Sequence, residues 1–259
     1  MDNRPIGLFD SGVGGLSILS DLKKTLPKEN FIFLADQLNV PYGQKTKKEL
    51  IKLTEAITQF LLKFNIKILV VACNTASCYA IGSLRSKFDI PIVGVVPAIK
   101  PASSITKNGR IAIMSTVATA KSPYLDKLIK QFAAPFKVLK LGCSGLEDAV
   151  EVLNTGKISK LLDKYVGKIK DFDADVIILG CTHYPWLKNQ IKDRINSKVS
   201  IVDSGSAVAK RVSAVLRNKN ISANTKSRDL FFTTGSPIKF SEVTSILLKN
   251  KITASKALV

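Results

Sequence analysis

Residues 68–78 read ILVVACNTASC, so that five apolar residues run without a charge into Cys73, Asn74 and Thr75. A short apolar run rich in β-branched residues is typical of a strand buried on both faces of a parallel sheet. The small polar residues that follow are typical of the start of a helix. The stretch therefore predicts a buried strand that delivers a cysteine to its carboxyl end.

Similar apolar runs recur along the chain and alternate with helical patterns. Apolar residues recur at helical spacing over residues 50–64 and again over residues 158–172. This alternation predicts an α/β fold in which parallel sheets are covered by helices on both faces. The expected strands cover residues 6–9, 31–35, 68–72, 91–96, 111–114, 137–141, 176–180, 199–202 and 230–235.

The spacing of these strands contains a repeat. Ile6 precedes Ile111 by 105 residues, and Ile68 precedes Val176 by 108 residues. Because a fixed offset between similar elements indicates duplicated units, we expect two similar parallel-sheet α/β domains. They would face each other across a central cleft with pseudo-twofold symmetry.

The expected domain boundaries follow from this repeat. The first α/β domain takes residues 1–97 plus 206–259, and the second takes residues 98–205. The proline-containing stretch at 97–109 is interpreted as the crossing into the second domain. The last apolar run, at 230–235, has no counterpart in the second unit and is expected to return to the first sheet.

Each unit ends its third strand in a cysteine. At the repeat register residues 73–75 align with residues 181–183, so that Cys73 falls on Cys181. Ligands of open parallel sheets bind beyond the carboxyl ends of the strands, and both thiols would then point into a shared cleft. Two thiols on opposite sides of a carbon acid can remove a proton from one face and return one to the other. This arrangement predicts racemisation.

Residues near the cysteines offer several supporting roles. We expect the pKa of each thiol to be lowered toward neutrality by a helix N-terminus or a nearby cation. The single histidine, His183, is a candidate catalytic or orienting group. Asp10 either caps a helix that begins near Gly14 or polarises a base. The glycines in residues 12–15 suit a tight turn whose N–H groups face an anion.

Composition limits the function classes. The chain has 259 residues, of which 46% are apolar, and it has no apolar run of 18 or more residues. The N-terminus lacks the pattern of a signal peptide, so a cytoplasmic location is expected. The four cysteines lie far apart or at strand ends, which favours reduced thiols over a disulfide framework.

The net charge of +19 is the most unusual bulk property. The lysines are scattered through helical segments, which favours a solvated surface that attracts small anions over a nucleic-acid interface. Any nucleic-acid binding is expected to be weak, nonspecific and steeply dependent on salt. We expect no membrane partner.

Three other readings compete with a racemase. Residues 6–17, IGLFDSGVGGLS, place a glycine-rich turn after a strand, and Asp36 follows at the distance of a ribose-binding acid in an NAD-binding oxidoreductase. Against this reading, Asp10 would sit in the phosphate loop. A cysteine-nucleophile amidohydrolase activated by His183 would leave the second cysteine unexplained. Zinc binding lacks any C-x-x-C pair, and no metal is expected.

Six motifs in order along the chain resemble those of glutamate racemase, of the cofactor-independent aspartate/glutamate racemase superfamily. They are FDSGVGGLS (9–17), ADQLNVPYG (35–43), VVACNTAS (70–77), IVGVVPAIKPA (92–102), LGCTHYP (179–185) and VDSGSAVA (202–209). The resemblance implies interconversion of L- and D-glutamate without a cofactor, which provides D-glutamate for peptidoglycan synthesis. We also expect the protein to form a homodimer, which is independent of the spacing of its strands.

The resemblance also implies roles for individual residues. Cys73 would serve the D-enantiomer and Cys181 the L-enantiomer, with help from Asp10 and His183. Where most members resemble CPxFVPLVE, this chain has CSGLEDAVE at 143–151, and Glu151 is our choice over Glu147 for the auxiliary acid. The implied substrate contacts are Asp10, Ser11, Tyr42, Gly43, Asn74, Thr75, Thr116, Thr119, Thr182 and His183, of which Thr116 and Thr119 form a carboxylate-binding TxxT.

Overall fold

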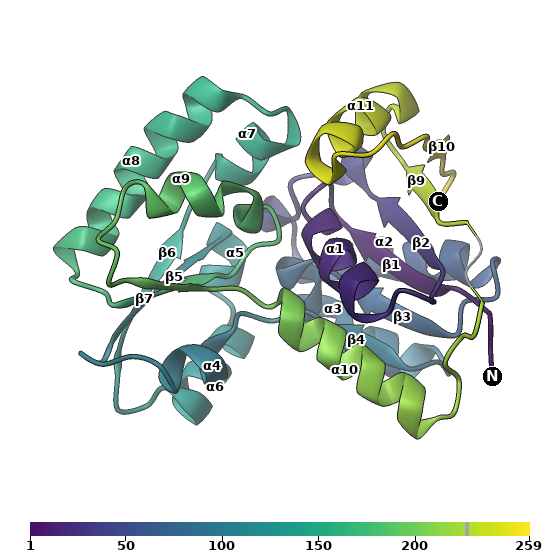
Figure 1. Ribbon diagram of the computed structural model, residues 1–259, viewed down its shortest axis with the longest axis horizontal. Helices are drawn as coiled ribbons and strands as arrows, with labels where there is room; N and C mark the ends of the chain where they lie inside the picture. Colours follow the sequence, from purple (N-terminus) through teal and green to yellow (C-terminus); the bar gives the residue numbers. More distant parts are fainter. Residues whose placement is uncertain (226–227) are drawn as a thin grey trace.

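The computed structural model describes residues 1–225 and 228–259, which form two parallel sheets. The six-stranded sheet has the order β10 (Ser255–Lys256), β9 (Leu230–Thr233), β2 (Phe31–Ala35), β1 (Ile6–Asp10), β3 (Ile68–Val71) and β4 (Ile92–Gly94). The four-stranded sheet has the order β6 (Lys137–Gly142), β5 (Arg110–Ser115), β7 (Val176–Leu179) and β8 (Ser200–Val202). The two domains built on these sheets lie side by side (Figure 1).

The strand order confirms the repeat. Strands β2, β1, β3 and β4 follow one another across the first sheet as β6, β5, β7 and β8 do across the second. The register agrees as well, since Ile6 is paired with Ile68 in β3 and Ile111 is paired with Val176 in β7. The run at 230–235 also pairs with β2 as expected. The short strand β10, which extends that edge of the sheet, was not predicted.

Helices cover both faces of the first sheet because its strands are apolar on both sides. Ile6 and Leu8 pack with one set of helices, and Phe9 packs with the other. The first set is α1 (Leu16–Thr25), α10 (Gly205–Asn218) and α11 (Pro237–Leu248); the second is α2 (Lys47–Leu62) and α3 (Asn74–Lys87). Two short 3₁₀ turns, η1 (Gln37–Asn39) and η2 (Tyr42–Gln44), follow β2.

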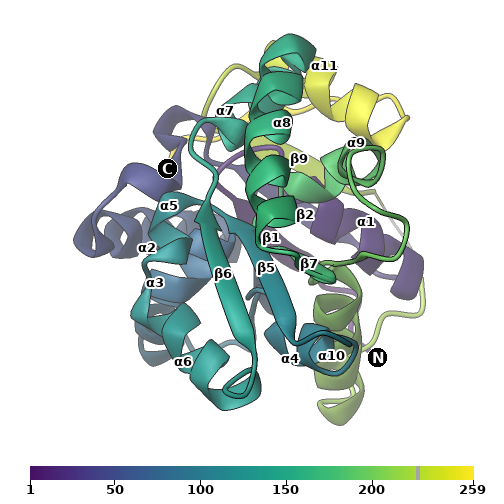
Figure 2. The same cartoon turned by 90° about the vertical axis from the view of Figure 1, so that its left-hand side faces the viewer.

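The second sheet is covered in the same way, and Figure 2 shows this domain facing the viewer. Met114 and Leu179 pack on one side, with Ile113 and Ile178 on the other. The first side is covered by α7 (Leu146–Glu151), α8 (Thr155–Asp171), the 3₁₀ turn η3 (Tyr184–Leu187) and α9 (Lys188–Lys192), and the second by α4 (Ile99–Ser103) and α6 (Pro123–Phe132). A short helix, α5 (Val117–Ala120), follows β5.

The segment at 97–109 differs in part from the expected linker. It does carry the chain from β4 in the first sheet to β5 in the second, but it contains α4, whose Ile99 and Ala102 are buried. The burial of these two residues against β5 and β7 makes the helix part of the second domain's core. The domain boundaries expected at residues 97 and 206 stay a prediction.

Hydropathy gives no membrane segment. Among the described residues no helix is both long enough and apolar enough to cross a bilayer.

Candidate active site

Both predicted bases line one cavity between the domains. Cys73 follows β3 of the first sheet and Cys181 follows β7 of the second, and both thiols face a cavity of about 10 Å³. This volume holds about one water molecule. The other lining residues are Ser11, Val40, Pro41, Tyr42, Gly43, Asn74, Thr75, Thr116, Glu147, Thr182 and His183.

Cys73 stands at the first turn of α3. Its sulfur accepts a hydrogen bond from the backbone N–H of Ala76 at 3.5 Å and lies 3.9 Å from the hydroxyl of Ser11. Burial raises the pKa of Cys73, and the neighbouring Asp10 raises it further. The expectation of a lowered thiol pKa is therefore wrong here, because removal of water outweighs the helix N-terminus.

Cys181 belongs to a chain of three titratable groups. Its sulfur lies 3.5 Å from Nδ1 of His183, whose Nε2 lies 2.6 Å from Oε1 of Glu151. Burial raises the pKa of Cys181, although the contact with His183 opposes the rise. A 3₁₀ turn follows Cys181 where an α-helix was expected, so the histidine rather than a helix dipole is its electrostatic partner.

Glu151 connects this series of three titratable groups to the first domain. Its carboxylate accepts hydrogen bonds from the backbone N–H of Val13 at 2.7 Å and from Nε2 of Gln37 at 2.9 Å, besides the contact with His183. Burial alone would raise the pKa of Glu151, but these hydrogen bonds outweigh it and hold the pKa below its usual value. The pKa of His183 is raised well above its usual value because Cys181 and Glu151 outweigh the effect of burial.

The glycine-rich turn after β1 makes room for this contact. A Cβ at Gly12 would lie 1.8 Å from Oε1 of Glu151, and a Cβ at Gly14 would lie 2.5 Å from Nδ1 of His183. The turn does present an N–H group to an anion, as its composition predicted. That anion is the carboxylate of the protein's own Glu151, so the Val13 N–H is not free to bind a phosphate.

Asp10 is held at the end of β1 and does not cap α1. Its carboxyl accepts hydrogen bonds from the Gly12 N–H at 2.9 Å, from the Ser11 hydroxyl at 3.2 Å and from the Thr182 hydroxyl of the other domain at 2.9 Å. Burial raises the pKa of Asp10, while His183 opposes that rise. Asp10 is therefore a buried acid that contacts the neighbour of Cys73, Ser11, and the residue after Cys181, Thr182.

Hydroxyl groups from both domains form a cluster on another side of the cavity. The hydroxyl of Thr75 lies 3.0 Å from that of Thr116 and 3.2 Å from that of Thr119, and Thr116 caps α5 through the Thr119 N–H. Oδ1 of Asn74 is buried without a hydrogen-bond partner among the described residues. Hydroxyl donors of this kind suit a carboxylate.

The turn that carries Tyr42 and Gly43 is fastened to the first sheet. The Tyr42 hydroxyl donates to Oδ2 of Asp36 at 2.7 Å, and the Thr234 hydroxyl donates to Oδ1 of Asp36 at 2.7 Å. The amide of Asn39 also contacts this carboxylate. Asp36, the candidate ribose-binding acid, is therefore fully engaged in holding the turn over the cavity.

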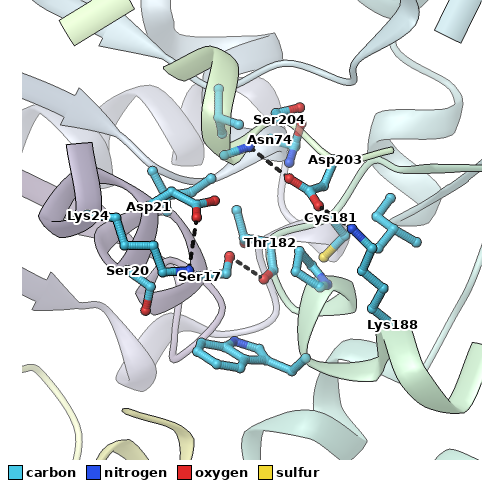
Figure 3. Close-up of a pocket in the computed structure, with 16 residues that line it drawn as sticks. Ser17, Ser20, Asp21, Lys24, Asn74, Cys181, Thr182, Lys188, Asp203 and Ser204 are labelled. Carbon is cyan, nitrogen blue, oxygen red and sulfur yellow. Dashed lines mark hydrogen bonds and ion pairs between the residues drawn. The ribbon is translucent and has the colours of Figure 1, made fainter. Parts of the chain in front are cut away.

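A second, larger cavity of about 210 Å³ adjoins the first (Figure 3). Asn74, Cys181 and Thr182 line both. Two ion pairs line the larger cavity on opposite sides, Lys24 with Asp21 at 3.6 Å and Lys188 with Asp203 at 3.4 Å, the second beside Cys181 (Figure 3). Of these two cavities, the small one is lined by both thiols, whereas the larger one is lined by Cys181 without Cys73.

The structure gathers the residues that the sequence singled out. Asp10, Thr119 and Glu151 do not line the small cavity, but each is hydrogen-bonded to a residue that does. Sequence reasoning missed Gln37 and the role of the Val13 N–H, for which the sequence holds no signal. No group of three or more His, Cys, Asp or Glu side chains within 1–225 and 228–259 is placed to hold a metal ion.

Comparison with known proteins gives a consistent result. Residues 22–212 match the family described as Asp/Glu/Hydantoin racemase. The chain is 39% identical to a glutamate racemase of Herpetosiphon aurantiacus, over 95% of this chain and 99% of the relative. It is 41% identical to a glutamate racemase of Shewanella oneidensis, over 86% and 84% of the two chains.

Solved structures agree with the sequence matches. A glutamate racemase isoform of Bacillus anthracis superposes with a TM-score of 0.92 at 32% identity, covering 100% of this chain and 99% of that one. The Escherichia coli glutamate racemase in complex with L-glutamate and the activator UDP-MurNAc-Ala superposes with a TM-score of 0.86 at 33% identity, covering 99% of both chains. The two-domain arrangement is thus that of these structures.

Proposed function

The chain belongs to the Asp/Glu/Hydantoin racemase family and interconverts L- and D-glutamate, and we propose that Cys73 and Cys181 are the two bases of this reaction. The observation that supports this assignment is that both sulfurs, one from each domain, line the same cavity. The D-glutamate formed serves peptidoglycan synthesis. An NAD-binding oxidoreductase and an amidohydrolase find no support among these relatives.

The reaction starts with one thiolate and one thiol. For L-glutamate, the thiolate of Cys181 removes the α-proton, and the thiol of Cys73 donates its proton to the opposite face of the α-carbon. The product is D-glutamate, with the thiolate now on Cys73, and the reverse direction exchanges these roles. Because burial raises the pKa of both thiols, each thiolate is strongly basic once formed.

The neighbours of each sulfur supply the charge balance. His183, held in its charged form by Glu151, stabilises the thiolate of Cys181. Asp10 lies on the side of Cys73, which it reaches through the Ser11 hydroxyl. We assign Asp10, His183 and Glu151 as assisting groups on this basis.

The substrate contacts proposed for glutamate follow from the lining of the cavity. The hydroxyls of Thr75, Thr116 and Thr119 and the amide of Asn74 offer donors to a carboxylate. The backbone around Gly43 and the side chains of Ser11, Tyr42 and Thr182 close the remaining sides. Fixed donors around an α-carbon that gains carbanion character supply electrostatic stabilisation.

The test is racemisation in D₂O with single cysteine variants. Cys73→Ala and Cys181→Ala should each abolish racemisation in both directions, as followed by circular dichroism. Cys73→Ala should still exchange the α-proton of L-glutamate, and Cys181→Ala that of D-glutamate, as followed by NMR. Cys78→Ala, which alters a half-buried cysteine outside the cavity, is the matched control. Undiminished racemisation by either active-site variant would remove that cysteine from the role of base.

Three further properties of the chain are proposals. A cytoplasmic location follows from the use of the product in peptidoglycan synthesis. A homodimer is expected, and light scattering would test it. Weak nucleic-acid binding is expected from the net charge of +19, and binding that persists at high salt would contradict it.

A further inference from the structure

Glu147 is a second carboxyl in the thiol cavity, and the mechanism above does not use it. It precedes Glu151 by one helical turn on α7, so both side chains leave the same face of the helix. The residue is 7% exposed and lines the cavity together with both cysteines. A Cβ added at Gly43 would lie 3.4 Å from Oε1 of Glu147, so the carboxyl reaches across the domain interface to the η2 turn.

The two carboxyls of α7 have different partners. Glu151 lies against His183 at 2.6 Å, whereas Glu147 receives a long hydrogen bond of 3.5 Å from the Tyr184 hydroxyl. No lysine or arginine is among the described residues that line this cavity. The other titratable groups that influence Glu147 or are influenced by it are His183, Cys181, Cys143, Tyr165 and Asp148.

Glutamate itself brings two carboxylates and one ammonium into this cavity. An ionised Glu147 beside a substrate carboxylate would place two like charges together where water is largely excluded, and one of the two would have to take up a proton. A protonated Glu147 becomes a hydrogen-bond donor in the same place. Burial raises the pKa of Glu147 and Asp148 adds to this rise, and together they outweigh the lowering by His183 and by the hydrogen bond from Tyr184.

We propose that Glu147 is a substrate-contacting, specificity-determining residue that binds a carboxylate of glutamate as a neutral carboxylic acid. It donates its proton in a hydrogen bond across the cavity, on the side where Thr116 and Gly43 approach. Substrate binding is therefore coupled to proton uptake, and affinity for glutamate falls as pH rises above the pKa of Glu147 in the free enzyme. This inference rests on the glutamate racemase activity described above.

The test compares three variants with the wild type across pH. Glu147→Gln keeps a donor that does not titrate, and Glu147→Leu removes it at similar size. Glu242→Gln, on the exposed face of α11, is the charge-matched control. For L-glutamate, KM and kcat are measured separately, and calorimetry in two buffers of different ionisation enthalpy counts the protons taken up on binding.

For the wild type and Glu242→Gln we expect KM to rise about tenfold per pH unit above the pKa of Glu147. In Glu147→Gln, KM should depend less on pH. On binding L-glutamate, this variant should take up fewer protons than the wild type, by as much as one per substrate molecule. Glu147→Leu should raise KM by ~10-fold or more at low pH, where the wild type has its donor.

Three outcomes would overturn the inference while leaving the racemase assignment intact. Equal KM profiles and equal proton uptake in the wild type and Glu147→Gln would show that the carboxyl does not touch the substrate. A wild-type KM that falls as pH rises, with a higher KM in Glu147→Gln, would show that an ionised Glu147 binds the ammonium group. If Glu147→Gln fails to fold, the absence of proton uptake in the wild type would be decisive against the inference. Absence of glutamate racemisation by the wild type would contradict the proposed function instead.

Discussion

Replacing Glu151 by Gln should slow racemisation by weakening the charge on His183. In the structure the carboxylate lies 2.6 Å from Nε2 of His183 and also binds Val13 and Gln37. A Gln side chain can still accept from two of these donors, but it carries no charge. A buried charged hydrogen bond contributes about 1.5–3 kcal/mol. Because about 1.4 kcal/mol corresponds to tenfold in rate, kcat/KM should fall by roughly 10- to 150-fold.

The pair of His183 and Glu151 also sets the direction in which kcat/KM changes with pH. Glu151 raises the pKa of His183 in the wild type, so the protonated histidine that stabilises the Cys181 thiolate is present below that raised pKa and is lost as pH rises through it. Without the carboxylate the pKa of His183 falls. The alkaline decline of kcat/KM in Glu151→Gln should therefore begin at lower pH than in the wild type.

The assay is circular dichroism of racemisation from both enantiomers. L- and D-glutamate have equal free energies, so kcat/KM must fall by the same factor in the two directions. Glu242→Gln, which makes the same change of charge on the exposed face of α11, is the control. A Glu151→Gln enzyme that folds and keeps kcat/KM within threefold of the wild type would refute the role given to this carboxylate.

Three other substitutions test a close contact at the site, its control in a helix, and a buried ion pair. Gly12→Ala should lower kcat/KM by ~10-fold or more, because the new Cβ would lie 1.8 Å from Oε1 of Glu151. Its control is Gly82→Ala, whose Cβ would have no neighbour within 4 Å. This control should leave kcat/KM unchanged and stabilise the fold by about 0.5–1 kcal/mol in thermal unfolding. Lys67→Met should destabilise the fold by about 3–5 kcal/mol, because it leaves Glu29, 2.6 Å from the Lys67 ammonium in a buried ion pair, without its partner. An unfolding free energy within 1 kcal/mol of the wild type would contradict that expectation.

The sheets could be predicted because their signals are local. Most strands are short apolar runs, and the offsets of 105 and 108 residues relate two sets of these runs. The repeat then placed Cys73 opposite Cys181 without any knowledge of the tertiary structure. The strand order in the two sheets agrees with that placement.

The environment of the thiols could not be predicted because it depends on contacts between distant segments. Glu151 meets Val13 from 138 residues away, and Gln37 from 114 residues away. The predicted direction of the thiol pKa shift was wrong for the same reason. The position of a cysteine at a strand end indicates that a helix begins nearby, but it does not indicate how deeply the thiol is buried. Glu147 was weighed only as an alternative to Glu151, although their spacing of four residues on a helix already placed both on one face.

The hydrogen bonds that join the two domains also involve the candidate catalytic groups Glu151 and Asp10. A cavity of about 10 Å³ is too small for an amino acid, so we expect the domains to separate when glutamate enters. Separation breaks the hydrogen bonds of Glu151 with Val13 and of Thr182 with Asp10, which join the two domains. Both carboxyl groups then regain water, and the burial that raises the pKa of Asp10 is relieved. The protonation states that suit proton transfer are therefore reached only when the cavity is closed around the substrate.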